Sequence, residues 1–267
     1  MKKGIFIYFG YDMPIAKRFE LIKNAGFDSV MVWWGDGDED EIVSLAQENN
    51  LFICNAHLPF EEINLLWNSD ESGDIYTDML CGLIKKCGNK NIPTAVLHVS
   101  RGVATPPYNE IGLNRIRKIL QVAQQSNVNI AFENLRYVHY LDYVFSNITS
   151  DKLKFCYDSG HHNCLSPERD LLSEFGDKLI ALHLDDNMGD SDIHMLPYDG
   201  TSNWDIVTDK LAKLNYNGVI SLEVQQDRHE MYADLQPEEF LKTALERAQR
   251  IENAILRKKA FNDENNT

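Results

Sequence analysis

The sequence predicts a single-domain α/β fold, a closed (β/α)8 barrel, and three observations point to it. The chain has 267 residues, and barrels of this class commonly have about 250. Short apolar runs alternate with amphipathic helical patterns along the whole length, which is typical of parallel strands joined by crossover helices. No linker or low-complexity segment interrupts this alternation, so we expect one barrel over 1–256 and a polar tail over 257–267.

Eight apolar runs are the candidate strands. They are rich in Val, Ile and Phe and contain almost no proline, as expected for strands that are buried on both faces. In chain order they are Gly4–Phe9, Ser29–Trp34, Leu51–Ala56, Thr94–Ser100, Asn129–Asn134, Lys154–Asp158, Leu179–Leu184 and Val219–Val224. Eight such units without a break in composition favour a closed barrel over an open doubly wound sheet.

Amphipathic segments between these runs are the candidate helices. In Pro14–Asn24, for example, Ile15, Phe19 and Ile22 lie on one helical face. The other predicted helices are Glu41–Glu48, Asp74–Lys86, Leu113–Gln125, Trp204–Leu214 and Pro237–Leu256. No Gly-x-Gly-x-x-Gly motif follows the first strand, so the sequence does not indicate a dinucleotide site.

The net charge argues against nucleic acid as a partner, and the cysteine content argues against disulfides and a zinc finger. The chain has 41 acidic and 26 basic residues, which gives a formal net charge of −15. Because the long-range field of such a protein repels phosphate, nucleic acid is not an expected partner. The five cysteines are an odd number without a Cys-x-x-Cys pair. This argues against a disulfide framework or a cysteine zinc finger and favours reduced, buried thiols.

The sequence indicates a cytoplasmic protein that does not enter a membrane. No apolar run reaches the roughly 18–20 residues that a membrane helix needs. The apolar N-terminus is superficially similar to a signal peptide, but Gly10-Tyr11-Asp12 ends the run and no small-residue cleavage site follows. The long helical pattern Pro237–Leu256 could support a homo-oligomer.

Side chains of metal-ligating types gather at the predicted carboxyl ends of six strands, where barrels of this class carry their active sites. They are His57, His98, Glu133, Asp158, His161, His183 and Glu223, with Asp192 and His194 following between the last two strands. Imidazole nitrogen and carboxylate oxygen suit Zn, Mn, Co or Fe(II), and ligands from separate strands can converge on the barrel axis. The sequence therefore predicts a divalent-metal site.

Longer motifs around these residues resemble the xylose-isomerase-like TIM barrel superfamily. The motifs are FENL at 132–135, YDSGHH at 157–162, ALHLDDN at 181–187, DIHMLPYDGTSNW at 192–204 and SLEV at 221–224, with weaker matches at 25–30 and 55–67. The superfamily contains the sugar phosphate isomerases and epimerases, the ketose 3-epimerases and endonuclease IV. The resemblance covers roughly residues 4–250.

The epimerase branch implies one metal ion held from four strands, by Glu133, Asp158, His183 and Glu223. The resemblance also implies that Glu133 and Glu223 act as acid and base on opposite faces of the substrate. The main hypothesis is therefore a divalent-metal-dependent isomerase or epimerase of a small sugar, sugar phosphate or related polyol. Zn or Mn is the expected metal, and Co, Mg or Fe would also suit these ligands.

Endonuclease IV implies an alternative, a phosphodiesterase with three zinc ions that acts on abasic-site DNA. The additional ligands would be His57, His98, His161, Asp192 and His194, so one to three ions are expected overall. Relatives described as sugar phosphate isomerases carry the early histidines and the Asp-x-His pair too, so the set does not select the nuclease. A second alternative is a non-catalytic, metal-stabilised sugar-binding barrel, although two glutamates at open metal positions suggest turnover.

The predicted rim of the barrel suits a small sugar-like molecule better than a duplex. Five of the seven residues of 35–41 are acidic, and Glu61-Glu62 adds further negative charge, whereas a DNA-binding rim needs Lys and Arg. Asp185 and Asp186 are expected to steady His183 or line the pocket. The candidate substrate contacts are Trp33, Trp34, Trp67, Asn134 and, as clamps for a phosphate or carboxylate, Arg101, Arg136 and Arg228. The alternatives are that the tryptophans belong to the core, that Asn134 orients Glu133, and that each arginine is a solvated surface ion.

Overall fold

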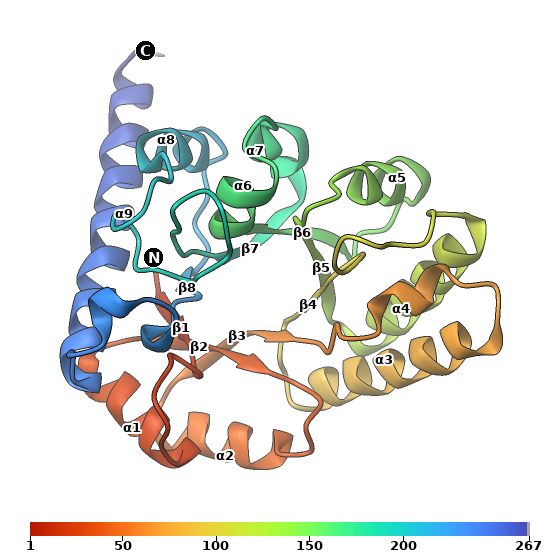
Figure 1. Cartoon of the computed structure of the whole chain (residues 1–267), viewed down its shortest axis with the longest axis horizontal. Helices are drawn as coiled ribbons and strands as arrows, with labels where there is room; N and C mark the ends of the chain where they lie inside the picture. Colours follow the sequence, from red (N-terminus) through yellow and green to blue (C-terminus); the bar gives the residue numbers. More distant parts are fainter. Residues whose placement is uncertain (266–267) are drawn as a thin grey trace.

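Eight parallel strands form the centre of the structure, and each lies where an apolar run predicted one (Figure 1). The computed structural model describes residues 1–265. Within that part of the chain the strands pair in the order β7-β6-β5-β4-β3-β2-β1-β8. Their bounds are β1 (Lys3–Phe6), β2 (Ser29–Trp33), β3 (Phe52–His57), β4 (Thr94–Leu97), β5 (Asn129–Glu133), β6 (Leu153–Asp158), β7 (Leu179–His183) and β8 (Ile220–Leu222).

The contact between β7 and β8 closes the sheet into a barrel. Leu184 follows β7 and pairs in parallel with Leu222. The N–H of Leu184 donates to the carbonyl oxygen of Ser221 at 2.9 Å, and the N–H of Glu223 donates to the carbonyl oxygen of Leu184 at 3.0 Å. The predicted closed (β/α)8 barrel is confirmed.

The six predicted helices are present, and four of them are longer than their patterns, by two to nine residues. They are α1 (Ile15–Ala25), α2 (Glu39–Glu48), α3 (Glu71–Asn89), α4 (Glu110–Ser126), α8 (Trp204–Lys213) and α9 (Pro237–Asn265). Three short helices have no counterpart in the predicted set, because they are too short to show a clear period: α5 (His139–Asn147), α6 (Ser159–Leu165) and α7 (Leu171–Phe175). Single 3₁₀ turns are η1 (Ile63–Trp67), η2 (Gly176–Lys178), η3 (Gln226–Arg228) and η4 (Glu230–Tyr232).

Polar caps explain why several helices begin where they do. The side chain of Asn109 accepts the N–H of Gly112 at the start of α4, and Asn203 accepts the N–H of Ile206 at the start of α8. Each cap satisfies one N–H that has no partner within its helix. These two caps therefore also fix where the loops that follow β4 and β7 end.

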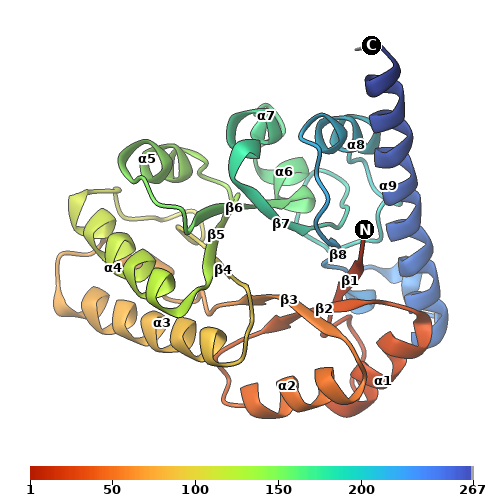
Figure 2. The ribbon, with the colours of Figure 1, turned by 180° about the vertical axis from the view of Figure 1, so that it is seen from behind.

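The last helix, α9, covers the outside of the barrel beside α1 and α8 (Figures 1 and 2). Several of its apolar side chains, including Phe240, Ala248 and Ile255, are fully buried within the chain, whereas Leu256 and Phe261 are exposed. The helix continues to Asn265, into the segment 257–267 that the sequence assigns to a polar tail. The homo-oligomer that this helix could support stays a prediction.

Two further expectations concern membranes and thiols. Within residues 1–265, none of the helices combines the length and the apolar character that crossing a bilayer would require. All five cysteines lie in the described part of the chain and are free thiols. Four of them are buried and Cys164 is partly buried, which agrees with the reading of the cysteines as structural side chains.

Candidate metal centre

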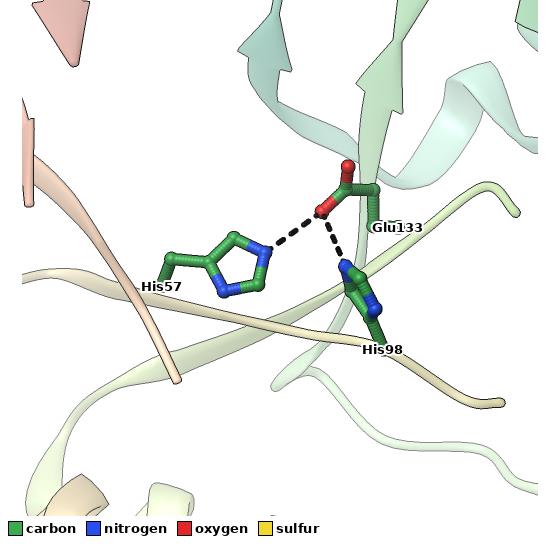
Figure 3. Close-up of side chains that lie close together, drawn as sticks. All are labelled: His57, His98 and Glu133. Atoms are coloured by element: carbon green, nitrogen blue, oxygen red, sulfur yellow. Dashed lines mark hydrogen bonds and ion pairs between the residues drawn. The ribbon is translucent and has the colours of Figure 1, made fainter. Parts of the chain in front are cut away.

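Glu133 lies at the centre of the barrel mouth and is surrounded by histidines. It is the last residue of β5, and its side chain is 1% exposed. Its Oε2 atom lies 3.2 Å from Nε2 of His57 and 3.5 Å from Nε2 of His98 (Figure 3). Its Oε1 atom lies 3.1 Å from Nδ1 of His161. One carboxylate therefore joins ligand-type side chains from three other segments of the chain.

The imidazoles determine the charge of this carboxylate. Burial opposes the ionised form, but His183, His161 and His57 outweigh burial and hold the pKa of Glu133 well below its ordinary value. Burial also lowers the pKa of His98, to about 4, because it disfavours the charged imidazolium. Glu133 is thus ionised and His98 neutral at pH 7, which are the forms that bind metal ions.

A first group of ligand-type residues comes from the strand ends, and we call it the strand-end cluster: Glu133, Asp158, His183 and Glu223. One ligand atom from each of the four lies within 4.8 Å of the others. Nδ1 of His183 is 3.0 Å from Oε2 of Glu223 and 3.5 Å from Oε2 of Glu133. The predicted quartet is therefore brought together, with three of its members at the last residue of a strand and Glu223 directly after β8.

Neighbouring amides hold two members of the strand-end cluster in place. The Oδ1 atom of Asn55 lies 3.4 Å from Nε2 of His183, which leaves Nδ1 directed at the carboxylates. Asn134 accepts the backbone N–H of Asp158 and donates to its carbonyl oxygen, both at 2.8 Å. Asn134 is fully buried and both ends of its amide are used. The structure therefore makes it a support for Asp158 in place of the predicted substrate contact.

Three further ligand-type residues form the loop cluster: His161, Asp192 and His194. The Oδ2 atom of Asp192 is 3.3 Å from Nε2 of His161 and 3.4 Å from Nε2 of His194. His161 stands at the start of α6, and the other two belong to the long loop between β7 and α8. With the histidine pair, His57 and His98, all nine predicted ligands lie around the barrel mouth.

Asp186 organises the loop that carries Asp192 and His194. Its fully buried carboxylate accepts the N–H groups of Asn187, Ser202 and Tyr198 at 2.9, 3.0 and 3.1 Å. It also accepts the indole N–H of Trp204 at 2.8 Å. One side chain therefore ties both ends of the loop to the first turn of α8, whereas the sequence led us to expect it beside His183 or in the pocket.

The buried polar atoms of the centre fit a divalent cation. Within the described residues, Oδ2 of Asp158, Nδ1 of His183 and Nδ1 of His98 are buried and make no hydrogen bond. Burial, together with the charges of Asp185, Glu133 and Glu223, raises the pKa of Asp158 well above its ordinary value. Such a cluster of nitrogen and carboxylate donors with excess negative charge is what a zinc or manganese ion binds.

The predicted tryptophan contacts separate into one rim residue and two core residues. The ring of Trp33 stacks on His57, with centroids 5.3 Å apart. Trp34 is fully buried and its indole N–H donates to the carbonyl oxygen of Leu83. Trp67 is 2% exposed and donates to Val99. In place of the predicted substrate contact, Trp34 and Trp67 therefore have their polar groups satisfied inside the core.

The three predicted arginine clamps are exposed side chains on the upper loops. Arg101 donates its backbone N–H to Oδ1 of Asn64, and its guanidinium lies over the ring of Phe60. Arg228 bonds to its neighbour Gln225, and Arg136 is exposed after β5. Whether any of them binds substrate stays a prediction.

Sequence reasoning missed Phe60, which covers the histidine pair. Its ring stacks on His98 with centroids 4.2 Å apart and meets His57 edge-on. It also meets Trp33 edge-on, at 5.5 Å. The signal was present in the sequence, since Phe60 follows His57 by three residues on an upper loop, but a lone phenylalanine is usually core. The rings form an aromatic wall on one side of the centre.

The chain is similar to several known proteins. It is 27% identical over 263 residues to the "Uncharacterized protein y4fM" of Sinorhizobium fredii, covering 82% of this chain and 84% of that protein. Among solved structures it is similar to D-psicose 3-epimerase from Clostridium cellulolyticum H10 (15% identity, TM-score 0.76, 96% of this chain and 99% of the other). It is also similar to an L-ribulose 3-epimerase (12% identity, TM-score 0.79, 100% and 98%) and a D-tagatose 3-epimerase-like protein (18% identity, TM-score 0.73, 94% and 99%).

These structural likenesses, all at low identity, show a shared fold. The family model described as xylose isomerase-like TIM barrel matches residues 19–252, which is most of the chain. The match includes the nine ligand-type residues at the barrel mouth, and the observed barrel has the architecture that the family name describes. The chain belongs to the xylose isomerase-like TIM barrel family.

Proposed function

We propose that the chain is a divalent-metal-dependent isomerase or epimerase of a small sugar, sugar phosphate or related polyol. The observation that carries this proposal is the convergence of Glu133, Asp158, His183 and Glu223 within 4.8 Å of one another. Structures with a similar fold include 3-epimerases of D-psicose and L-ribulose, which supports a ketose as the substrate class. Zn and Mn are the metals that the donor set favours.

The strand-end cluster would hold the ion, and the ion would polarise the carbonyl group of a ketose so that the adjacent C–H becomes acidic. Glu133 and Glu223 both reach the space beside His183, at 3.5 and 3.0 Å from its Nδ1 atom. In our proposal one of these glutamates removes the proton as a general base, and the other returns a proton to the same carbon. The imidazoles outweigh burial and keep the pKa of both carboxyls low, so both are ionised before substrate binds. Either glutamate can then accept the proton, and the opposite one returns a proton only after it has taken one up from solvent water.

The experiment is solvent deuterium uptake at carbon, measured by NMR over a panel of ketoses and ketose phosphates in D2O. We expect uptake into at least one ketose by the metal-loaded protein, and a loss of about 10²–10⁴-fold in Glu133→Gln or Glu223→Gln. Asp190→Asn, an exposed change on the β7–α8 loop, is the matched control. Unchanged uptake in both glutamate variants would contradict the acid–base assignment.

A trinuclear zinc phosphodiesterase is the second candidate, and one observation favours it. The histidine pair and the loop cluster lie beside the strand-end cluster, so ligands for three ions are close together. Two observations oppose it: Phe60 and Trp33 cover the histidine pair, and the rim loops 35–41 and 61–62 are acidic. Incision of abasic-site duplex DNA that disappears in His98→Ala would establish this candidate, and no incision with three zinc ions bound would exclude it.

Binding without turnover would identify the third candidate, a non-catalytic sugar-binding barrel. The deuterium experiment separates it from the first, because a bound ketose would then exchange no carbon-bound hydrogen at any pH or with any divalent metal. Isothermal calorimetry with the same ketose panel provides the binding arm. The two glutamates beside a metal position argue for turnover, since a binding protein has no need of a second proton acceptor there.

A further inference from the structure

We propose that Asp185 is a positioning residue for the loop cluster: its buried carboxylate holds the ring of His194 so that Nε2 faces Asp192 and His161. The inference rests on the metal centre proposed above. It concerns a residue outside the nine predicted ligands, one that the sequence led us to expect beside His183 or in the pocket.

The carboxylate of Asp185 lies between two donors from different parts of the chain. Its Oδ2 atom is in ion-pair contact with Nδ1 of His194 at 3.1 Å, without the alignment of a hydrogen bond, and its Oδ1 atom accepts the backbone N–H of Gly160 at 2.8 Å. Asp185 is fully buried, so water does not compete for either oxygen. A histidine that donates from Nδ1 to a carboxylate presents its other nitrogen to a metal in a defined direction. Nε2 of His194 indeed lies 3.4 Å from Oδ2 of Asp192.

The backbone of Asp185 is fixed to the beginning of α6. The hydroxyl of Ser159 donates to the carbonyl oxygen of Asp185 at 2.7 Å, and the N–H of Asp185 donates to the same hydroxyl at 3.0 Å. Helix α6 also carries His161, the other histidine of the loop cluster. Asp185 therefore connects the helix that bears one histidine with the loop that bears the other.

The loop needs such a connection, because the backbone of His194 is strained. Its φ angle is +47°, in the left-handed region that residues other than glycine rarely adopt. A side chain held from Nδ1 opposes relaxation of this conformation. The antiparallel bridge between Asp186 and Met195 fixes the peptide directly after His194 but leaves its ring to be oriented by other groups.

Gly160 shows that the chain leaves space for this carboxylate. A Cβ atom at position 160 would lie 2.3 Å from Oδ1 and 2.4 Å from Oδ2 of Asp185. The backbone at Gly160 is helical, within α6, so its conformation does not itself require glycine. The absence of a side chain at 160 is thus explained by the position of the Asp185 carboxylate.

The first test compares zinc binding to Asp185→Asn and Asp190→Asn, by competition with a chromophoric chelator and by elemental analysis. Asparagine has one acceptor oxygen, so it cannot accept the N–H of Gly160 and also present an oxygen to Nδ1 of His194. We expect affinity for one ion to fall about 10–100-fold in Asp185→Asn, with the remaining zinc unchanged. Asp190→Asn makes the same change at an exposed position of the same loop and should bind like wild type. Equal affinities in the two variants would overturn the inference.

A second variant and a spectroscopic readout separate positioning from direct ligation. Gly160→Ala leaves Asp185 chemically intact but displaces its carboxylate. The affinity for the same single ion should therefore fall. In zinc-loaded protein labelled with 15N-histidine, long-range 1H–15N correlation should show His194, assigned with His194→Gln, protonated at Nδ1 and not at Nε2. A proton on Nε2 would contradict the inference, since Asp185 would then be acting as a ligand beside Nδ1.

The outcomes distinguish failure of this inference from failure of the proposed function. If wild type binds zinc and Asp185→Asn binds it equally well, the positioning role is wrong and the metal centre stands. If wild type binds no divalent metal, the proposed function fails. Amide hydrogen exchange of the metal-free protein then tests whether Asp185 holds the loop without any metal. Amides of 187–195 should exchange faster in Asp185→Asn than in Asp190→Asn, and equal rates would overturn the positioning role.

Discussion

The strand-end cluster and the loop cluster lie at the same barrel mouth but are held in place by different means. In the first, three of four side chains sit on the last residue of a strand, so the backbone ladder of the barrel sets their positions. In the second, Asp192 and His194 belong to a loop whose shape depends on the buried carboxylates of Asp185 and Asp186. Ligands on strands follow from the fold, whereas ligands on loops need supporting side chains of their own.

The two clusters also differ in charge. The strand-end cluster has three carboxylates and one imidazole, and burial with neighbouring carboxylates raises the pKa of Asp158 well above its ordinary value. In the loop cluster two imidazoles face one carboxylate. Burial would raise the pKa of Asp192, but His194 and His161 outweigh it and lower the pKa to about 2. The strand-end cluster therefore has the greater need of a cation, and we expect it to bind the tightest ion.

Asp158→Asn should have the largest effect on metal binding. It removes an anionic ligand from the strand-end cluster but keeps an oxygen that can accept the N–H of His161 at the start of α6. We expect the affinity of the tightest ion to fall by about 10³-fold or more, because removing a charged ligand costs several kcal/mol. Calorimetric titration of the metal-free protein with Zn²⁺ or Mn²⁺ measures this affinity. Full affinity in this variant would place the tight ion elsewhere.

His194→Gln should affect the loop cluster alone. We expect loss of one weaker ion, with the tight ion retained within about threefold, since no atom of His194 belongs to the strand-end cluster. Elemental analysis after dialysis against a defined free zinc concentration provides the count. If the tight ion were lost as well, the two clusters would be one coupled site, and the claim that they are held independently would be wrong.

Asp186→Ala should lower the stability of the loop and the fold more than it lowers the affinity for the tightest ion. The change leaves four N–H donors without their shared acceptor in a buried place. We expect the free energy of unfolding to fall by about 2–5 kcal/mol. Urea unfolding of the metal-free protein measures this value, with Asp190→Asn as the exposed control. A loss below about 0.5 kcal/mol would show that the loop does not depend on Asp186.

Metal binding should release protons, and the loop cluster should contribute. Burial alone would lower the pKa of His194, but Asp192 and Asp185 raise it to about 9 in the metal-free protein. His194 is therefore protonated at pH 7, below that pKa, and a metal ion must displace the proton. We expect about one proton from His194, and fewer as the pH rises through 9. Calorimetry in two buffers of different ionisation enthalpy measures the release, and His194→Gln should lower it.

The sequence predicted the barrel, and it predicted nine ligand-type residues that the structure places around the barrel mouth; that they bind metal stays a prediction. The barrel and the ligands at strand ends depend on regular features, whereas Asp192 and His194 lie on an irregular loop. Strand ends recur with the period of the fold, and residues such as Glu133 and His183 stand at the end of apolar runs. The loop contacts could not be predicted in this way. The ion-pair contact between Asp185 and His194 joins residues nine apart on an irregular loop, and its geometry depends on the left-handed backbone of His194 and on Gly160.

The substrate contacts were the least predictable part of the site. Trp34 and Trp67 were expected at the rim because they follow strand ends or open helices, but their indole N–H groups donate to carbonyl oxygens inside the core. Phe60 was overlooked, although its ring covers the histidine pair. A single aromatic residue has the same local sequence signal in a core and on a rim. Its position is determined by packing between segments that are distant in the chain.

The most direct test of the account is the metal content of protein purified without chelator or affinity nickel, followed during stepwise removal by a chelator. We expect at least one equivalent of Zn or Mn. We also expect the last ion to leave to be the one held by the strand-end cluster, retained in His194→Gln and absent from Asp158→Asn. Protein without bound divalent metal, or metal that is lost equally from both variants, would contradict it.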